Sequence, residues 1–211
     1  MKIKKILFVV FIVLLVFLVY KVFLDNQIYY LNLNTISNDD YSKYYKETLE
    51  QSDKLEYYNN DYNVEDYRIT DLIRFINENT EIVVNGKKQT INHALIKADI
   101  ITVWVGMNEL SYKINTENIQ ELYRYSDTIL MDLEELFLLL RKFSKEKIIF
   151  MNFYNPGNSK YDEVISYLNS KMNAIAIEYE IDVLDVSHIV NNKIETEDYK
   201  KINSILEEIS F

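Results

Sequence analysis

The stretch ADIITVWVGMNE, residues 98–109, decides the expected fold of this chain. Its apolar run is rich in β-branched residues, which is typical of a strand buried on both faces of a parallel sheet. Gly106 follows the run and permits a tight turn, because glycine readily adopts positive φ. Asn108 offers two side-chain N–H donors, which can stabilise a developing negative charge. Because ligands of such sheets bind beyond the carboxyl ends of the strands, Gly106 and Asn108 mark a candidate site.

Strands and helices are expected to alternate on both sides of this stretch. Other short apolar runs typical of strands lie at 28–33, 54–58, 147–153 and 181–186. Apolar residues recur at helical spacing in 41–49, 67–76, 119–140, 164–179 and 199–209. Asn85-Gly86 is typical of the tight turn of a small hairpin. The pattern predicts an α/β fold, a doubly wound three-layer sandwich with a mainly parallel, five-stranded sheet.

Residues 6–24 form an apolar run in which Lys21 is the one charged side chain. A helix of this length, at about 1.5 Å per residue, spans the roughly 30 Å hydrocarbon layer of a bilayer. Bulky and charged residues follow the run where a signal-peptide cleavage site needs small ones, so we expect an uncleaved transmembrane anchor. The lysines among the first five residues predict a cytoplasmic N-terminus. The chain therefore divides into an anchor region, 1–25, and one extracellular domain, 26–211.

Charge and composition exclude several classes of function. The chain has 211 residues and a net charge of −10. Such an acidic surface repels phosphate backbones, so we expect no nucleic-acid partner. Cysteine is absent, which excludes disulfides, a cysteine nucleophile and thiolate metal sites. His93 and His188 are the two histidines, so we expect neither a metal site nor a cofactor, and His93 is expected to be a surface or cap residue.

The segment Gly106-Met-Asn-Glu109 resembles the Gly-x-Asn-Asp block of the SGNH (GDSL) hydrolases, with Glu109 in place of the final Asp. Asn152-Phe-Tyr-Asn-Pro156 resembles a Tyr-Asn-Pro loop of bacterial members. The resemblance implies an esterase- or lipase-type α/β fold over most of residues 28–211. It also implies that Asn108 helps to form the oxyanion hole for ester hydrolysis.

The first family block departs from the pattern of active members. Leu33-Asn-Thr-Ile-Ser37 stands where active relatives carry Gly-Asp-Ser with the nucleophilic serine. Asn34 takes the glycine position and is expected to preserve the turn, because asparagine tolerates positive φ. Thr35 or Ile36 falls at the serine position, and Ser37 reaches it only if the loop has gained a residue. The resemblance therefore implies a turn without its nucleophile.

Two other blocks also depart. Asp66 stands where relatives have a glycine whose N–H joins the oxyanion hole, and we expect Asp66 to cap the following helix. Asn191 and Ile194 stand roughly where relatives carry Asp-x-x-His, whose histidine activates the serine. No histidine follows His188. His188 lies just past the last expected strand and is the remaining candidate base, with Ser37 as the candidate nucleophile.

We therefore predict a membrane-anchored SGNH-like protein without the catalytic serine and dyad, which acts as a binding or scaffolding module. The resemblance implies an acylated glycan or lipid of the cell envelope as its ligand. One alternative is an active ester hydrolase that uses Ser37 with His188, or a carboxylate-activated water. Another is a structural subunit of a membrane complex. For Asn108, a side-chain bond to the turn backbone remains open beside a binding role. The 18 tyrosines suit half-buried packing better than a sugar-stacking platform.

Overall fold

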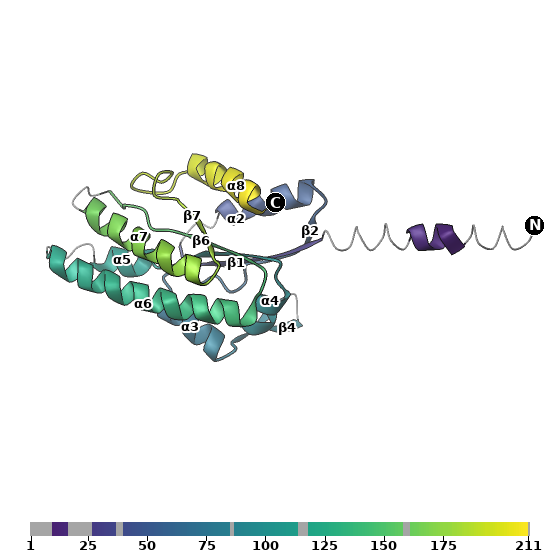
Figure 1. Cartoon of the computed structure of the whole chain (residues 1–211), viewed down its shortest axis with the longest axis horizontal. Coiled ribbons are helices and arrows are strands. Elements are labelled where there is room, and N and C mark those ends of the chain that lie inside the picture. The colour runs from purple at the N-terminus through teal and green to yellow at the C-terminus, as the bar shows by residue number, and fades with distance from the viewer. Residues whose placement is uncertain are drawn as a thin grey trace, which may run out of the picture.

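A computed structural model of the chain describes residues 10–16, 27–36, 40–84, 87–113, 118–157 and 161–210. Its domain has three layers, with a five-stranded parallel sheet between two layers of helices (Figure 1). The strand order is β2-β1-β5-β6-β7. The bounds are β1 (Ile28–Asn34), β2 (Leu55–Asn59), β5 (Ile100–Trp104), β6 (Lys147–Met151) and β7 (Asp182–Leu184). The predicted α/β fold with a five-stranded parallel sheet is confirmed.

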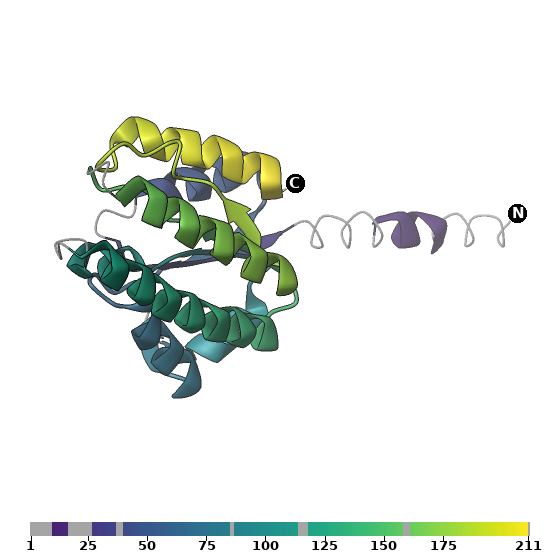
Figure 2. The ribbon, with the colours of Figure 1, turned by 60° about the vertical axis from the view of Figure 1, so that its left-hand side comes forward.

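Two helices cover one face of the sheet, and the others cover the opposite face (Figure 1 and Figure 2). The first pair is α2 (Asp40–Gln51) and α8 (Thr196–Ser210), which pack against each other. The opposite layer contains α3 (Ile69–Asn77), α4 (Ile91–Lys97), α6 (Ile119–Phe143) and α7 (Asp162–Glu178). The short helix α5 (Met107–Lys113) contacts α6. The sequence pattern did not predict α5, because seven residues are too few to show helical periodicity.

The core follows the predicted apolar pattern. All five residues of β5 are buried, as expected for a strand in the middle of a doubly covered sheet. In α6, Leu122, Ile129, Leu133 and Leu140 are buried at helical spacing. Tyr30, Tyr41, Tyr45 and Tyr62 are also buried, which agrees with the packing role expected for tyrosines.

The hairpin predicted around residues 85–86 consists of β3 (Glu81–Val84) and β4 (Lys87–Thr90), which pair in antiparallel fashion. The two turn residues themselves lie outside the described residues. Thr90 ends β4 and also caps α4, since its hydroxyl accepts the backbone N–H of His93 at 3.4 Å. His93 is exposed on the surface, as expected.

Gly106 follows β5 and has a φ of +99°, which confirms the predicted tight turn. A Cβ at this position would lie 2.8 Å from Cε1 of Phe153, the second residue after β6. The exits of these two neighbouring strands are therefore in close contact, and glycine is required both for its backbone conformation and for its small size.

Residues 10–16 are helical, and Figure 1 shows them apart from the α/β domain. Their apolar side chains are 44–62% exposed. In the part of the chain that the structure describes, no helix has the length and apolar character needed to cross a membrane. Most of the predicted anchor, 6–24, lies outside the described residues, and the anchor stays a prediction.

Candidate functional site

The candidate site lies at the carboxyl ends of β1 and β5. β1 connects to β2 on one side, whereas β5 lies on its other side, so the strand order reverses between β1 and β5. Ligands of open α/β sheets bind at such a switch point. Thr35 and Ile36 follow β1, and Gly106 and Asn108 follow β5. The structure thus brings together the first and third family blocks, and the backbone N–H of Thr35 donates to the carbonyl of Trp104 at 3.2 Å.

The side-chain amide of Asn108 is fully engaged with the backbone. Its Nδ2 atom lies 3.0 Å from the carbonyl oxygen of Thr35 and 3.0 Å from that of Tyr67. A primary amide has two hydrogens, and these two carbonyls accept them. The side-chain bond to backbone that the sequence left open is therefore present. A role of Asn108 as an oxyanion donor stays a prediction, and it requires the amide to exchange one of these partners.

The loop after β1 also uses its own backbone donors. Asn34 Oδ1 accepts the N–H of Ile36 at 2.8 Å, and Asn63 Oδ1 accepts the N–H of Asn34 at 2.7 Å. Asn34 does not use the positive φ that asparagine tolerates, because it continues β1 opposite Trp104 and turns the chain through its side chain. The N–H groups of Thr35 and Ile36 thus both have internal acceptors, and Ser37 lies outside the described residues.

Asp66 does not cap the helix that follows it. α3 begins at Ile69 with Arg68 as its N-cap, so Asp66 precedes the cap by two residues. Asp66 instead has a φ of +65°, in the left-handed region that favours glycine. This conformation agrees with the glycine that relatives have in the corresponding block. The N–H of Arg68 donates to Asp71 Oδ2 at 3.1 Å.

Glu109 accepts a hydrogen bond from the first residue of α3. Its side chain is buried, at 4% exposed, and Oε1 accepts the N–H of Ile69, the first residue of that helix. A carboxylate at this position also interacts favourably with the helix dipole. Oε2 is buried and has no hydrogen-bond partner among the described residues. Burial raises the pKa of Glu109, against the lowering effect of its backbone hydrogen bonds.

The residues at the expected dyad positions carry no acid or base. Asn191 is exposed and forms an isolated bridge with Lys193. Ile194 is half-buried and packs against the core before α8. The structure places neither side chain in a hydrogen bond that would orient a catalytic base, in the part of the chain that it describes.

A cluster that the sequence analysis missed follows β7. Asp185 Oδ1 accepts hydrogen bonds from Asn152 Nδ2 at 2.8 Å and from Ser187 Oγ at 2.6 Å. Asp185 Oδ2 lies 3.6 Å from Nε2 of His188. Burial acts to raise the pKa of Asp185, but the hydrogen bonds of Ser187 and Asn152 together outweigh it and lower that pKa.

The spacing Asp185-Val-Ser-His188 was the signal that could have found this cluster, because it equals the Asp-x-x-His spacing of active relatives. Its geometry differs from a serine–histidine pair, since the Ser187 hydroxyl donates to the carboxylate and not to the imidazole. The His188 side chain is 87% exposed. An exposed imidazole held by one weak contact is poorly oriented as a general base.

No family model matches the sequence, and no curated protein is significantly similar to it. Solved structures are similar in fold. The acetylxylan esterase Axe2 from Geobacillus stearothermophilus has a TM-score of 0.65 at 14% identity, over 87% of this chain and 94% of that one. The lipase Lip_vut3 from a goat rumen metagenome has a TM-score of 0.62 at 13% identity, over 86% of this chain and 97% of the lipase chain. The chain has an SGNH-like esterase and lipase fold.

Another similar structure is LAE5, an α/β hydrolase enzyme from the metagenome of Lake Arreo, with a TM-score of 0.62 at 12% identity. The match covers 87% of this chain and 94% of the LAE5 chain. The SGNH-like fold is thus present over nearly the whole domain, whereas the activity must be argued from the site itself.

Proposed function

We propose that this chain is a non-hydrolytic protein of SGNH-like fold, which binds a ligand of the cell envelope. One observation carries the proposal: the amide of Asn108 donates to the carbonyls of Thr35 and Tyr67. In an ester hydrolase of this fold the same amide must face the oxyanion that forms during acyl transfer. Here it holds two loops together.

The surrounding groups support the same conclusion. Acyl transfer needs a nucleophile whose base lies within hydrogen-bond distance and is oriented by a third group. By the family resemblance, Thr35 or Ile36 falls at the serine position, and the N–H groups of both residues have internal acceptors. His188, the candidate base, is exposed and contacts Asp185 alone among described side chains within ion-pair distance. The fold would therefore serve as a frame for binding.

The test is hydrolysis of a short-chain aryl ester by the full chain in detergent micelles, together with labelling by a serine-directed fluorophosphonate. We expect turnover equal to that of a heat-inactivated sample, and no label. Ser37→Ala and His188→Ala should leave both results unchanged. Turnover that disappears in Ser37→Ala would establish an active serine hydrolase instead.

The second candidate function is ester hydrolysis by Ser37 with His188. The observation in its favour is that Asp185 and His188 lie just past β7, at the carboxyl edge of the sheet. A rearranged loop that brought Ser37 to His188 would complete a serine, a histidine and an aspartate. The two candidates differ in one measurable respect, since only this one predicts that His188→Ala abolishes turnover of an aryl ester.

We also propose that residues 6–24 anchor the domain in the membrane, with residues 26–211 outside the cell. The length and apolar character of the run support an anchor, and the lysines before it support a cytoplasmic N-terminus. We expect the chain to stay in the membrane fraction after alkaline carbonate extraction, and the domain to be digested by protease added outside intact cells. Release by carbonate would contradict the anchor.

A further inference from the structure

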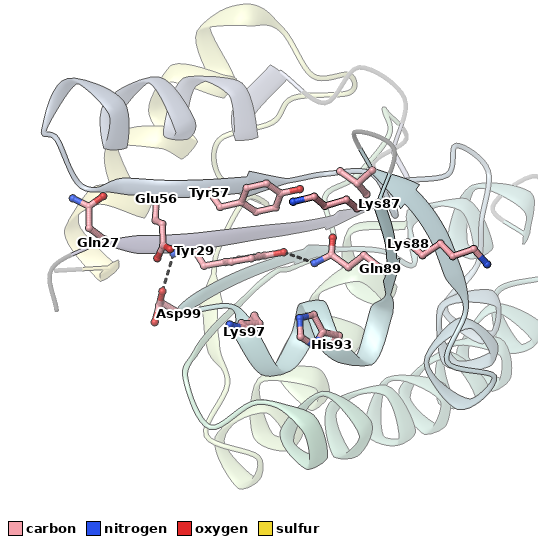
Figure 3. A pocket seen from close by; sticks show the side chains of 11 residues that line it. Gln27, Tyr29, Glu56, Tyr57, Lys87, Lys88, Gln89, His93, Lys97 and Asp99 are labelled. Carbon is pink, nitrogen blue, oxygen red and sulfur yellow. Dashed lines mark hydrogen bonds between the residues drawn. The ribbon is translucent and has the colours of Figure 1, made fainter. Parts of the chain in front are cut away.

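A cavity of about 980 Å³ lies on the sheet face that α4 and the β3–β4 hairpin border (Figure 3). Its volume falls within the range of sites for small organic ligands, about 300 to 1,000 Å³. Gln27, Tyr29 and Asp99, which line it, lie at the amino ends of β1 and β5. The cavity is therefore separate from the candidate site at the carboxyl ends of the same strands.

Two tyrosines form the floor of the cavity. Tyr29 of β1 and Tyr57 of β2 are partners in the strand register, and their ring centroids are 4.8 Å apart at an interplanar angle of 47°. Both tyrosines are half-buried. The next residues along the two strands, Tyr30 and Tyr58, form a separate pair of contacting rings. Half-exposed aromatic faces suit the apolar C–H face of a sugar ring, and the phenol adds a polar tip.

A hydrogen-bond network fixes this floor to the hairpin. Tyr29 OH accepts from Gln89 Nε2 at 2.8 Å and from Asn59 Nδ2 at 3.3 Å. Tyr62 OH donates to the carbonyl of Gln89 at 3.0 Å. Asn59 is fully buried behind the floor. Because these bonds hold the ring and one wall in place before any ligand arrives, binding would cost little ordering of side chains.

Basic side chains lie on two sides of the floor. Figure 3 shows Lys87 of β4 beside Tyr57, and His93 and Lys97 of α4 on the other side of Tyr29. Lys87 and Lys97 make no ion pair with any described residue, whereas Lys88 pairs with Glu81 at 2.6 Å. In a chain with a net charge of −10, two unpaired ammonium groups around one cavity favour an anionic ligand.

The two carboxylates of the cavity lie toward Gln27 in the same view (Figure 3). Asp99 Oδ2 accepts the backbone N–H of Tyr29 at 2.7 Å, which compensates part of its charge. Glu56 is exposed and has no ion pair with a described residue. Carboxylates of this kind accept hydrogen bonds from the hydroxyl groups of a sugar.

We propose that this cavity binds an acidic saccharide, meaning a sugar or short glycan that carries a carboxylate or a phosphate. The sugar ring lies on Tyr29 and Tyr57, its acidic group contacts Lys87 or Lys97 at one side of the rings, and Glu56 accepts hydrogen bonds from its hydroxyls. The inference rests on the proposed binding function and supplies the site and the ligand class for it.

The test is isothermal titration of the full chain in detergent micelles with trigalacturonic acid and with glucose 6-phosphate. At least one of them should bind about tenfold more tightly than neutral maltotriose, and added salt should weaken it. Tyr57→Ala and the double variant Lys87→Ala/Lys97→Ala should each weaken binding about fivefold or more. The matched controls, Tyr112→Ala and Lys142→Ala/Lys171→Ala, remove an exposed ring or two charges elsewhere and should have no effect.

Absence of binding by both acidic saccharides, or binding that the cavity variants leave unchanged, would overturn the inference. Equal binding of inorganic phosphate alone would reduce the cavity to a simple anion site. Binding to phosphatidylglycerol vesicles that needs Lys87 and Lys97 but not Tyr57 would assign it to the membrane surface. Each of these results contradicts a saccharide site. The aryl-ester assay is a separate test. A chain that neither hydrolyses the ester nor binds a saccharide would overturn this inference but not the proposed function. A chain that hydrolyses the ester would overturn the proposed function, and the titration would still decide this inference.

Discussion

The side-chain Nδ2 atom of Asn108 lies 3.0 Å from the carbonyl oxygen of Tyr67, a residue 41 positions earlier in the chain. The same atom donates to the carbonyl of Thr35. One amide thus joins the loop after β1, the loop before α3 and the first turn of α5.

Asn108→Ala should lower the free energy of unfolding by about 2 kcal/mol, because two hydrogen bonds are lost and two carbonyls lose their donors. Asn108→Asp should lower the free energy of unfolding by a similar amount, since a carboxylate offers acceptors only. Urea unfolding of both variants measures the loss, and Asn191→Ala, at an exposed asparagine, should change little. Unchanged stability of Asn108→Ala would show that the amide is free for a ligand.

Gly106→Ala should be strongly destabilising, by about 2 to 4 kcal/mol, because positive φ and a close contact act together. The added Cβ would lie 2.8 Å from the Phe153 ring, between two strand exits. Gly157→Ala is the control, since it also has positive φ but would meet the side chain of Asn192 at 3.1 Å. We expect thermal unfolding to show a smaller loss at Gly157, where the chain is exposed, and equal losses would contradict the close packing at Gly106.

Glu109 gives stability a defined dependence on pH. Burial raises its folded-state pKa above the ordinary value of 4.5, so protonation of Glu109 favours the folded state over the unfolded one. This contribution to the free energy of unfolding is complete below that value. The contribution is lost as pH rises through the raised pKa. The stability of the wild type relative to Glu109→Gln should therefore fall between about pH 4 and about pH 8. Urea unfolding at both pH values checks this trend.

The control for the pH experiment is Glu208→Gln, which changes an exposed glutamate of α8. Its stability relative to the wild type should vary much less over the same interval. A Glu109→Gln curve parallel to the wild type would show that the buried carboxyl does not titrate differently in the folded chain.

Arg141→Lys should lower stability by about 2 kcal/mol, because lysine cannot reproduce a planar fork of donors. The guanidinium of Arg141 donates to the carbonyls of Tyr179 and Glu146 at 2.7 Å each, and also to that of Glu180. It thereby joins the end of α6 to the turns before β6 and β7. Denaturation of Arg141→Lys beside Lys142→Ala, its exposed neighbour, measures the effect, and equal stability of both variants would contradict it.

The sequence was sufficient for the architecture, because strands and long helices leave apolar patterns of period two and of about 3.6. The buried strand within residues 98–109 and the apolar stripe of α6 were predicted correctly for that reason. The tight turn at Gly106 was also predicted correctly, since a glycine directly after a buried strand is typical of such a turn. The helix α5 is too short to carry a period, and it was missed.

The side chains of the candidate site were harder to predict because their partners are distant in sequence. Glu109 accepts from Ile69, 40 residues away, and no local pattern reveals such a bond. At Asn34 the sequence could not show how the chain turns, since an asparagine can turn the chain through its side chain as well as through positive φ. The cavity at Tyr29 could not be foreseen, as its lining comes from strands that become neighbours only in the folded sheet.

The packing of α2 against α8 has a consequence for biosynthesis. Thr48 Oγ1 donates to Glu207 Oε1 at 3.0 Å across 159 residues of sequence, and Ile202 and Leu206 complete the buried layer over Tyr45 and Leu49. A nascent chain that has not yet delivered α8 leaves the apolar side of α2 open to solvent. Closure of the domain therefore waits until α8 has emerged, and until then chaperones and quality-control proteases have an uncovered hydrophobic surface to bind.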